Sequence, residues 1–172
     1  MMGCSASSAR SSSAVRIGSP LPSSESAAAD VPAGAACSGA GPSAARPGTF
    51  AVVNSRGGRL TFGTGGGTDF TPTELLLAAI GGCTAIDVDI LTSRRADPES
   101  FAVTVDASKI RDEEGNRLTD LEVTFRVRFP DGPDGDAARE VLPEAVQRSH
   151  DWICTVGRTV ESGDAMRVSG RT

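Results

Sequence analysis

Two cysteines far apart in the sequence, Cys83 and Cys154, are the side chains best suited to covalent chemistry. A thiolate is a strong nucleophile, and two thiols can form a disulfide if their Cα atoms come within about 7 Å. Structural disulfides are rare in reducing compartments, so a cysteine pair on two packed elements there indicates redox catalysis. The sequence therefore predicts thiol chemistry, with close packing of two small buried side chains as the alternative.

The surroundings of Cys83 support both interpretations. It follows Gly81 and Gly82 near the middle of the apolar stretch ELLLAAIGGCTAIDVDIL, residues 74–91. A glycine inside a helix costs roughly 1 kcal/mol relative to alanine. The two glycines either let another backbone approach closely or leave space beside the thiol. In both cases a leucine at Gly82 is expected to overpack the interior.

The first 48 residues differ in composition from the rest. They are almost entirely Ser, Ala, Gly and Pro with a few charges, and they include Cys4 and Cys37. Such a segment has too little apolar surface to offset its ordering entropy. We expect residues 1–48 to be a disordered tail with incidental thiols, and residues 49–172 to be one domain that folds without it.

Charge and apolar runs exclude several function classes. The formal net charge is −5, and no basic stripe is present, so a general nucleic-acid binder is not expected. The longest apolar run, residues 75–80, is shorter than the roughly 20 residues of a membrane span. The start MMGCSASSAR has no apolar signal core. No zinc-type spacing is present, because the four cysteines are far apart and His150 is the single histidine. We therefore expect a soluble cytoplasmic protein without metal or cofactor.

A long helix is the best-marked element. Thr71 fits the N-cap, Pro72 the first helical position and Glu74 the third, which is the pattern of a capping box. The helix is apolar around most of its circumference and is expected to be buried on most sides. A short hairpin, residues 49–54 and 59–62, and the loop GTGGGTDF precede it. That loop lacks the spacing and the lysine of a P-loop.

Strands and a second helix follow. Residues 101–111 and 121–129 alternate apolar and polar positions and predict a hairpin. Residues 136–150 predict a helix that Pro143 kinks or begins. Trp152 is expected to anchor the next segment in the core, and residues 165–170 to form a last strand. The order predicts an α+β fold with helices on one face of an antiparallel sheet.

Both cysteine motifs resemble those of one family. TPTELLLAAIGGCTAIDVDIL and AVQRSHDWICTVGRTV are similar to the two cysteine motifs of the OsmC/Ohr family of thiol peroxidases. The resemblance implies an OsmC-like fold in which antiparallel sheets pack around long central helices in an intertwined homodimer. It implies reduction of organic hydroperoxides in the bacterial cytoplasm, with Cys83 as the peroxidatic and Cys154 as the resolving thiol. It also implies a dithiol reductant, for which the family suggests a lipoylated protein.

The family also has an arginine and a glutamate at its site. SRGGRL is similar to the family's glycine-rich turn, which assigns the arginine to Arg56, with Arg59 as second choice. In one branch the glutamate lies ten residues before the first cysteine, where this chain has Thr73. Glu74 lies nine before, as in the looser OsmC-like branch. Glu74 is therefore either a site residue or only a helix cap.

Asp87 lies four residues after Cys83 and thus on the same helix face. A carboxylate there disfavours a thiolate unless a cation neutralises it. Asp87 is either the partner of the arginine or a structural residue. Two functions remain open: a thiol peroxidase, and a non-enzymatic OsmC-like protein that binds a small lipophilic molecule at the dimer interface.

Overall fold

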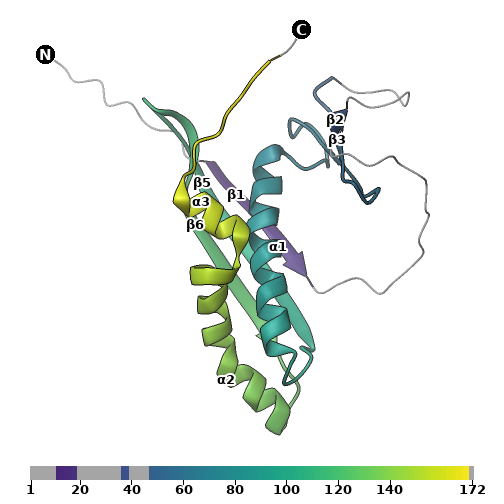
Figure 1. Ribbon diagram of the computed structural model, residues 1–172, viewed down its shortest axis with the longest axis vertical. Coiled ribbons are helices and arrows are strands. Elements are labelled where there is room, and N and C mark those ends of the chain that lie inside the picture. The colour runs from purple at the N-terminus through teal and green to yellow at the C-terminus, as the bar shows by residue number, and fades with distance from the viewer. Residues whose placement is uncertain (1–10, 19–35, 39–46, 171–172) are drawn as a thin grey trace, which may run out of the picture. The chain divides into compact units, whose positions relative to one another are not determined.

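The computed structural model describes residues 11–18, 36–38 and 47–170 (Figure 1). They fall into two compact units, residues 1–19 with 77–172 and residues 20–76. The elements in chain order are β1 (Ser11–Gly18), β2 (Ala36–Ser38), β3 (Phe50–Val53), β4 (Arg59–Phe62), α1 (Pro72–Thr92), β5 (Ser100–Asp112), β6 (Gly115–Arg128), α2 (Pro133–Arg148), a π-helical turn (Ser149–Ile153) and α3 (Thr155–Ser162).

The larger unit is a sheet covered by helices. Its antiparallel strands have the order β1-β5-β6, and α1 and α2 lie side by side across the sheet (Figure 1). Leu77 and Val88 of α1 and Val103 and Val105 of β5 are fully buried in one apolar core, to which α2 contributes Ala145. This confirms the α+β class with helices on one face of an antiparallel sheet.

The smaller unit contains a second antiparallel sheet, of order β2-β3-β4. The predicted hairpin of β3 and β4 is confirmed, and the rings of Phe50 and Phe62 stack across it at 5.8 Å. Its turn is organised by Asn54, whose Oδ1 accepts the backbone N–H groups of Arg56 and Gly58, both at 2.9 Å. Gly57 sits at φ +84°, a conformation that favours glycine.

Helix α1 begins as the sequence predicts. The Thr71 N–H donates to Glu74 Oε2 at 2.7 Å, and the Glu74 N–H donates to Thr71 Oγ1 at 3.2 Å, which completes the capping box. In the described part of the chain, α1 alone is long and apolar enough to cross a membrane by length and composition. The uninterrupted run of residues 75–80 had not indicated this, because charged residues and glycines break the apolar pattern beyond it.

The two glycines of α1 have different surroundings. A Cβ at Gly81 would lie 2.7 Å from both Ile17 Cδ1 and Val105 Cγ2, so the missing side chain lets α1 approach β1 and β5 closely. A Cβ at Gly82 would meet nothing within 4 Å. Gly81 is therefore the packed position, and the surroundings of Gly82 give no support to the expected overpacking there.

The expectation of disorder is wrong for part of the N-terminal segment. Residues 11–18 form β1, which pairs antiparallel with β5 from Ser11↔Lys109 to Gly18↔Ala102. Val15 is buried and Ile17 half-buried, whereas the alternate residues Ala14 and Arg16 are exposed. This two-residue alternation of an edge strand was hidden by the surrounding Ser- and Ala-rich composition. Residues 36–38 form β2; the other predictions for residues 1–46 lie outside the described residues.

Three further expectations are wrong. Helix α2 starts at Pro133 and continues through Pro143. Residues 165–170 are not a strand, and α3 was not expected at all. Trp152 is 83% exposed and does not anchor the core, because the π-helical turn points its ring outward.

Candidate active site

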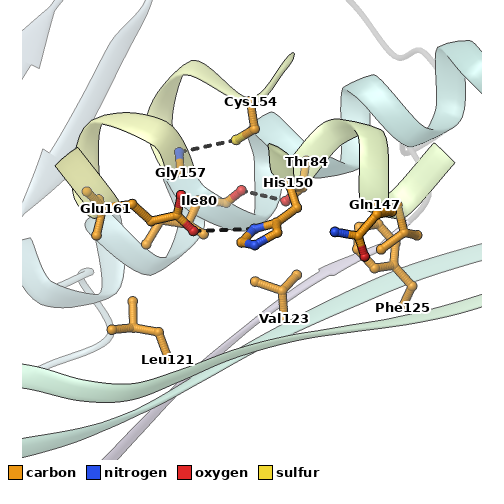
Figure 2. Close-up of a pocket in the computed structure, with 12 residues that line it drawn as sticks. Ile80, Thr84, Leu121, Val123, Phe125, Gln147, His150, Cys154, Gly157 and Glu161 are labelled. Atoms are coloured by element: carbon orange, nitrogen blue, oxygen red, sulfur yellow. Dashed lines mark hydrogen bonds and ion pairs between the residues drawn. The ribbon is translucent and has the colours of Figure 1, made fainter. Parts of the chain in front are cut away.

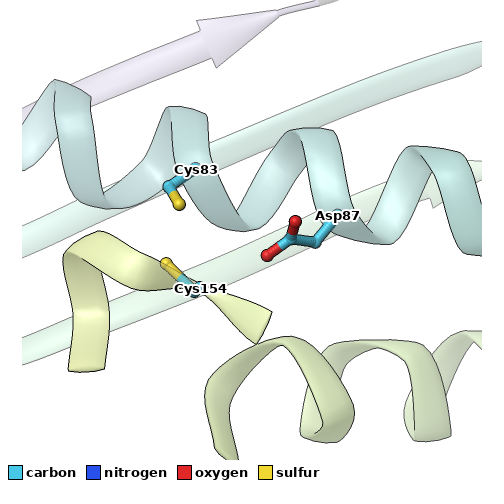
Figure 3. Close-up of side chains that lie close together, drawn as sticks. All are labelled: Cys83, Asp87 and Cys154. Carbon is cyan, nitrogen blue, oxygen red and sulfur yellow. The ribbon is translucent and has the colours of Figure 1, made fainter. Parts of the chain in front are cut away.

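The larger unit brings Cys83, Asp87 and Cys154 together, and we call these three residues the Cys–Asp–Cys cluster (Figure 3). The two Sγ atoms and a carboxylate oxygen all lie within 4.8 Å of one another. Both thiols are free. The predicted proximity of the two cysteines is thereby confirmed, and the cluster could carry out thiol–disulfide chemistry or hold a metal ion.

Helix α1 positions Cys83 and Asp87 four residues apart on the face turned toward Cys154 (Figure 3). Asp87 Oδ2 accepts a hydrogen bond of 2.9 Å from Ser149 Oγ, and Ser149 is completely buried. The ion pairs among the described residues involve other carboxylates, not that of Asp87. Asp87 thus ties α1 to the π-helical turn, and its carboxyl group lies beside two sulfurs.

Cys154 lies between the π-helical turn and α3, and it is the N-cap of α3. Its Sγ accepts the Gly157 N–H at 3.3 Å, and the residue is 1% exposed. Burial raises the pKa of the Cys154 thiol, and the negative charges of Cys83 and Asp87 add to this, although the Gly157 hydrogen bond acts in the opposite direction. Burial outweighs the favourable helix N-terminus, so Cys154 is held as a neutral thiol.

A cavity of about 390 Å³ lies next to Cys154 (Figure 2). Its wall combines apolar side chains of β6 with residues from the middle of α1, the end of α2 and α3. At one side His150 Nδ1 lies 3.4 Å from Glu161 Oε1. The lining residues are Ile80, Thr84, Leu121, Val123, Phe125, Val146, Gln147, His150, Cys154, Gly157, Val160 and Glu161. The cavity could hold an apolar group of a small molecule with its polar end at His150.

Arg56 and Glu74 belong to the smaller unit, so their assignment to the site stays a prediction. Arg56 is exposed in the turn between β3 and β4. Glu74 closes the capping box, and the hydrogen bonds from Thr71 lower the pKa of its carboxyl group. The capping interpretation of Glu74 is confirmed, which leaves open a second role at the cysteines.

Sequence reasoning did not find Ser149, Gly157 and the cavity. Ser149 matters only because the π-helical turn places it against Asp87, for which the sequence has no signal. The glycine three residues after Cys154 was a readable signal, since an N-cap side chain accepts from the third helical N–H. The absence of a zinc-type spacing excluded only a local motif, because the cluster joins residues of distant elements.

Comparison with known proteins identifies the family. The model of OsmC-like proteins matches residues 65–169, and the chain belongs to this family. Proteins of Mycobacterium tuberculosis and Mycobacterium bovis, both described as uncharacterized, are 30% identical to it over 99 residues, which are 58% of this chain and 70% of theirs.

Two solved structures are similar to the chain. A solved chain described only with the words structural genomics has 28% identity and a TM-score of 0.54, covering 68% of this chain and 84% of its own. An OsmC-like hydroperoxide resistance protein from Jannaschia sp. CCS1 has 19% identity and a TM-score of 0.37, covering 72% of this chain and 81% of its own.

Proposed function

We propose that this protein is a thiol-dependent peroxidase that reduces organic hydroperoxides. The observation that carries the proposal is the meeting of two free thiols, Cys83 and Cys154, within 4.8 Å from distant parts of the chain. Membership in the OsmC-like family and a solved relative described as a hydroperoxide resistance protein support the same reaction class.

The proposed cycle has three steps. The Cys83 thiolate attacks the hydroperoxide and takes one oxygen, which gives a sulfenic acid and, after protonation of the leaving alkoxide, an alcohol. The Cys154 sulfur then attacks the Cys83 sulfur, so that a disulfide forms and the sulfenic oxygen leaves as water. An external dithiol reduces this disulfide to two thiols and becomes a disulfide itself.

Exposure and protonation support the division of roles. Cys83 is half-buried and accessible to a small oxidant, whereas Cys154 is 1% exposed. The raised pKa of Cys154 keeps it a neutral thiol, which suits a group that reacts second. The cavity beside Cys154 supplies an apolar wall for the organic part of the substrate.

Arg56 and Glu74 complete the proposed site. An arginine is always charged and presents a planar fork of donors, so it can stabilise a thiolate and polarise the O–O bond. A carboxylate orients such an arginine through paired hydrogen bonds. Glu74 is the proposed orienting group, with Asp87 as the alternative because it is already beside both sulfurs.

We further propose a homodimer. Ile86 and Ile90 of α1 are 63% and 53% exposed, and Gly82 lies on the same side of the helix with open space around it. Such an apolar stripe fits the corresponding stripe of a second copy.

Light scattering tests the proposed dimer. The wild-type protein is expected to have the mass of a dimer, and the Ile86→Asp variant the mass of a monomer. A wild-type monomer at micromolar concentration would contradict the dimer.

The proposed setting is the bacterial cytoplasm, where a dithiol reductant such as a lipoylated protein returns the disulfide to thiols. This follows from the family resemblance of both cysteine motifs. The physiological hydroperoxide belongs to the organic class, since the cavity wall beside Cys154 is mainly apolar.

Mass spectrometry of the intact protein tests the peroxidase proposal. In a Cys4→Ser, Cys37→Ser background the two cluster cysteines are the only thiols. One equivalent of an organic hydroperoxide is expected to lower the mass by two hydrogens, about 2 Da, and a dithiol to restore it. Cys83→Ser is expected to leave Cys154 a thiol. Cys154→Ser is expected to give a Cys83 sulfenic acid with one equivalent, and sulfinic or sulfonic acid when the hydroperoxide is in excess. Unchanged thiols with persisting peroxide would refute the proposal.

The cavity favours a second candidate function, the binding of a small lipophilic molecule without catalysis. Its lining is mainly apolar, and its volume of about 390 Å³ is within the range of ligand pockets. Phe125→Ala, which enlarges the cavity, would then change the affinity for the ligand. Neither cysteine would be needed for binding. Binding that survives the Cys83→Ser, Cys154→Ser double variant, together with no peroxide consumption by the wild type, would favour this function.

A further inference from the structure

The Cys–Asp–Cys cluster brings together three groups that bind a metal ion in their anionic forms. Its three groups carry three negative charges when both thiols are deprotonated, and their donor atoms lie within 4.8 Å of one another. The described ion pairs give Asp87 no basic partner. Buried charges of one sign are costly unless a cation accompanies them. A divalent ion between the three donors would remove this repulsion.

The donor set fits a particular ion. Two sulfurs and one carboxylate oxygen are ligands of Zn²⁺, which binds thiolates at about 2.3 Å and carboxylates at about 2.0–2.2 Å. Tetrahedral coordination at these lengths places two sulfurs roughly 3.8 Å apart. The three donor atoms already lie within 4.8 Å of one another. Side-chain rotations that move these atoms by up to about 1 Å would bring them to the distances of a tetrahedral site.

Groups around the cluster already hold the donors in place. Ser149 Oγ donates to Asp87 Oδ2 at 2.9 Å and leaves the other carboxylate oxygen for a metal. The Gly157 N–H donates to Cys154 Sγ at 3.3 Å, as backbone amides commonly do at metal-bound thiolates. Such outer partners orient ligands and raise metal affinity. Because Cys83 is only half-buried, an ion can reach the cluster from solvent at this residue.

We propose that Cys83, Asp87 and Cys154 form a three-ligand Zn²⁺ site whose fourth position is open to water. Binding exchanges the two thiol protons for the metal, so both sulfurs become thiolates and two protons leave. The same two sulfurs form the disulfide of the peroxidase cycle. A bound Zn²⁺ therefore blocks oxidation of the pair, and the disulfide cannot bind the ion.

Metal binding is measured on the full-length reduced protein in the Cys4→Ser, Cys37→Ser background, without any hydroperoxide. Titration with Zn²⁺ against a chromophoric chelator is expected to give one ion per chain. Co²⁺ is expected to give the thiolate charge-transfer band and the visible bands of a tetrahedral site. The protein oxidised with diamide is expected to bind neither ion.

Variants assign the ligands. Cys83→Ser or Cys154→Ser should remove the Co²⁺ charge-transfer band of a two-thiolate site, and Asp87→Asn should weaken Zn²⁺ binding by more than tenfold. Ser149→Ala should weaken it by about 10–100-fold, as for an outer partner. Asp89→Asn, an exposed carboxylate on the same helix, is the matched control and should bind as the parent does. Circular dichroism of each variant separates lost ligands from lost folding.

The outcomes decide the inference independently of the peroxidase proposal. One Zn²⁺ per chain that depends on all three side chains supports the site even if no peroxide is consumed. Binding below one ion per chain, or binding that Asp87→Asn and Asp89→Asn leave equally unchanged, would overturn it even if the protein is an active peroxidase.

Discussion

The two sides of α1 are both apolar, yet they have opposite surroundings. On one side Leu77 and Val88 are completely buried, and Gly81 lets the helix approach β1 and β5. On the other, Ile86 and Ile90 are more than half exposed, and Gly82 faces open space. The core of the chain explains the first side. The core does not account for the second side, and the dimer that we propose would cover it.

The Cys–Asp–Cys cluster lies along the boundary between these two sides. Cys83 and Asp87 are half-buried and face Cys154 instead of the core or the exposed stripe. A helix with three different faces therefore holds the sheet, the reactive cluster and the proposed interface at once. Changes on each face should have effects of different kind as well as size.

The largest expected effect comes from removing β1, which forms part of the sheet under the packed side. A chain shortened to start at Arg46 loses Val15 and Ile17 and leaves β5 as a bare edge over the core. Burial of one such side chain contributes about 1.5–3 kcal/mol. We expect aggregation or a large fall in melting temperature.

A chain that starts at Arg10 retains β1 and is the control. It should melt as the full-length protein does. If the chain starting at Arg46 also melts unchanged, β1 adds nothing to stability, and the original expectation of a dispensable tail holds.

The next effect compares truncations on the two sides of α1. Leu77→Ala should lower the free energy of unfolding by about 2–5 kcal/mol at every protein concentration, because Leu77 is completely buried. Ile90→Ala should act on association, so that its effect on the urea midpoint grows as the protein is diluted. If both variants lost the same free energy of unfolding at every protein concentration, the two sides of α1 would not differ in their role.

The glycine pair provides a finer comparison at adjacent positions. Gly81→Leu places new atoms against Ile17 and Val105 and should cost about 1–3 kcal/mol by overpacking. A Cβ at Gly82 meets no described atom within 4 Å, so Gly82→Leu should act mainly on the proposed dimer. Thermal melts over a range of concentrations, with light scattering, distinguish the two. If monomeric Gly82→Leu had as low a melting temperature as monomeric Gly81→Leu, the chain itself would leave no room for a side chain at Gly82.

The sequence was sufficient for α1, the central hairpin and the proximity of the two thiols, because caps, alternation and the two cysteine motifs can be recognised in the sequence. It could not separate Gly81 from Gly82, since only the position of the sheet decides which one is packed. It also missed the bond between Ser149 and Asp87, which depends on a π-helical turn joining elements far apart in the chain. The predicted burial of Trp152 was wrong because the size of a side chain alone does not determine whether it is buried.

The smallest expected effect is at the start of α1, where the packed and exposed sides share one cap. Hydrogen bonds from Thr71 lower the pKa of Glu74, so its ionised form is favoured in the folded state. This stabilisation is present above the unfolded pKa and is lost as the pH falls through the lower folded value.

Glu74→Gln should therefore lower the melting temperature slightly at neutral pH, and the difference should vanish in acid, below about pH 4. Glu140→Gln, an exposed glutamate of α2, is the matched control for loss of one carboxylate. A difference that increases in acid would contradict the capping role of Glu74.

The position of β1 in the sheet constrains the order of folding during synthesis. Residues 11–18 leave the ribosome early, but their partner β5 ends only at Asp112. At a synthesis rate of about 5–20 residues per second, the first strand waits several seconds for the second. During that interval α1 emerges with both apolar sides uncovered, so the nascent chain is most exposed to aggregation and to chaperones before β5 is complete.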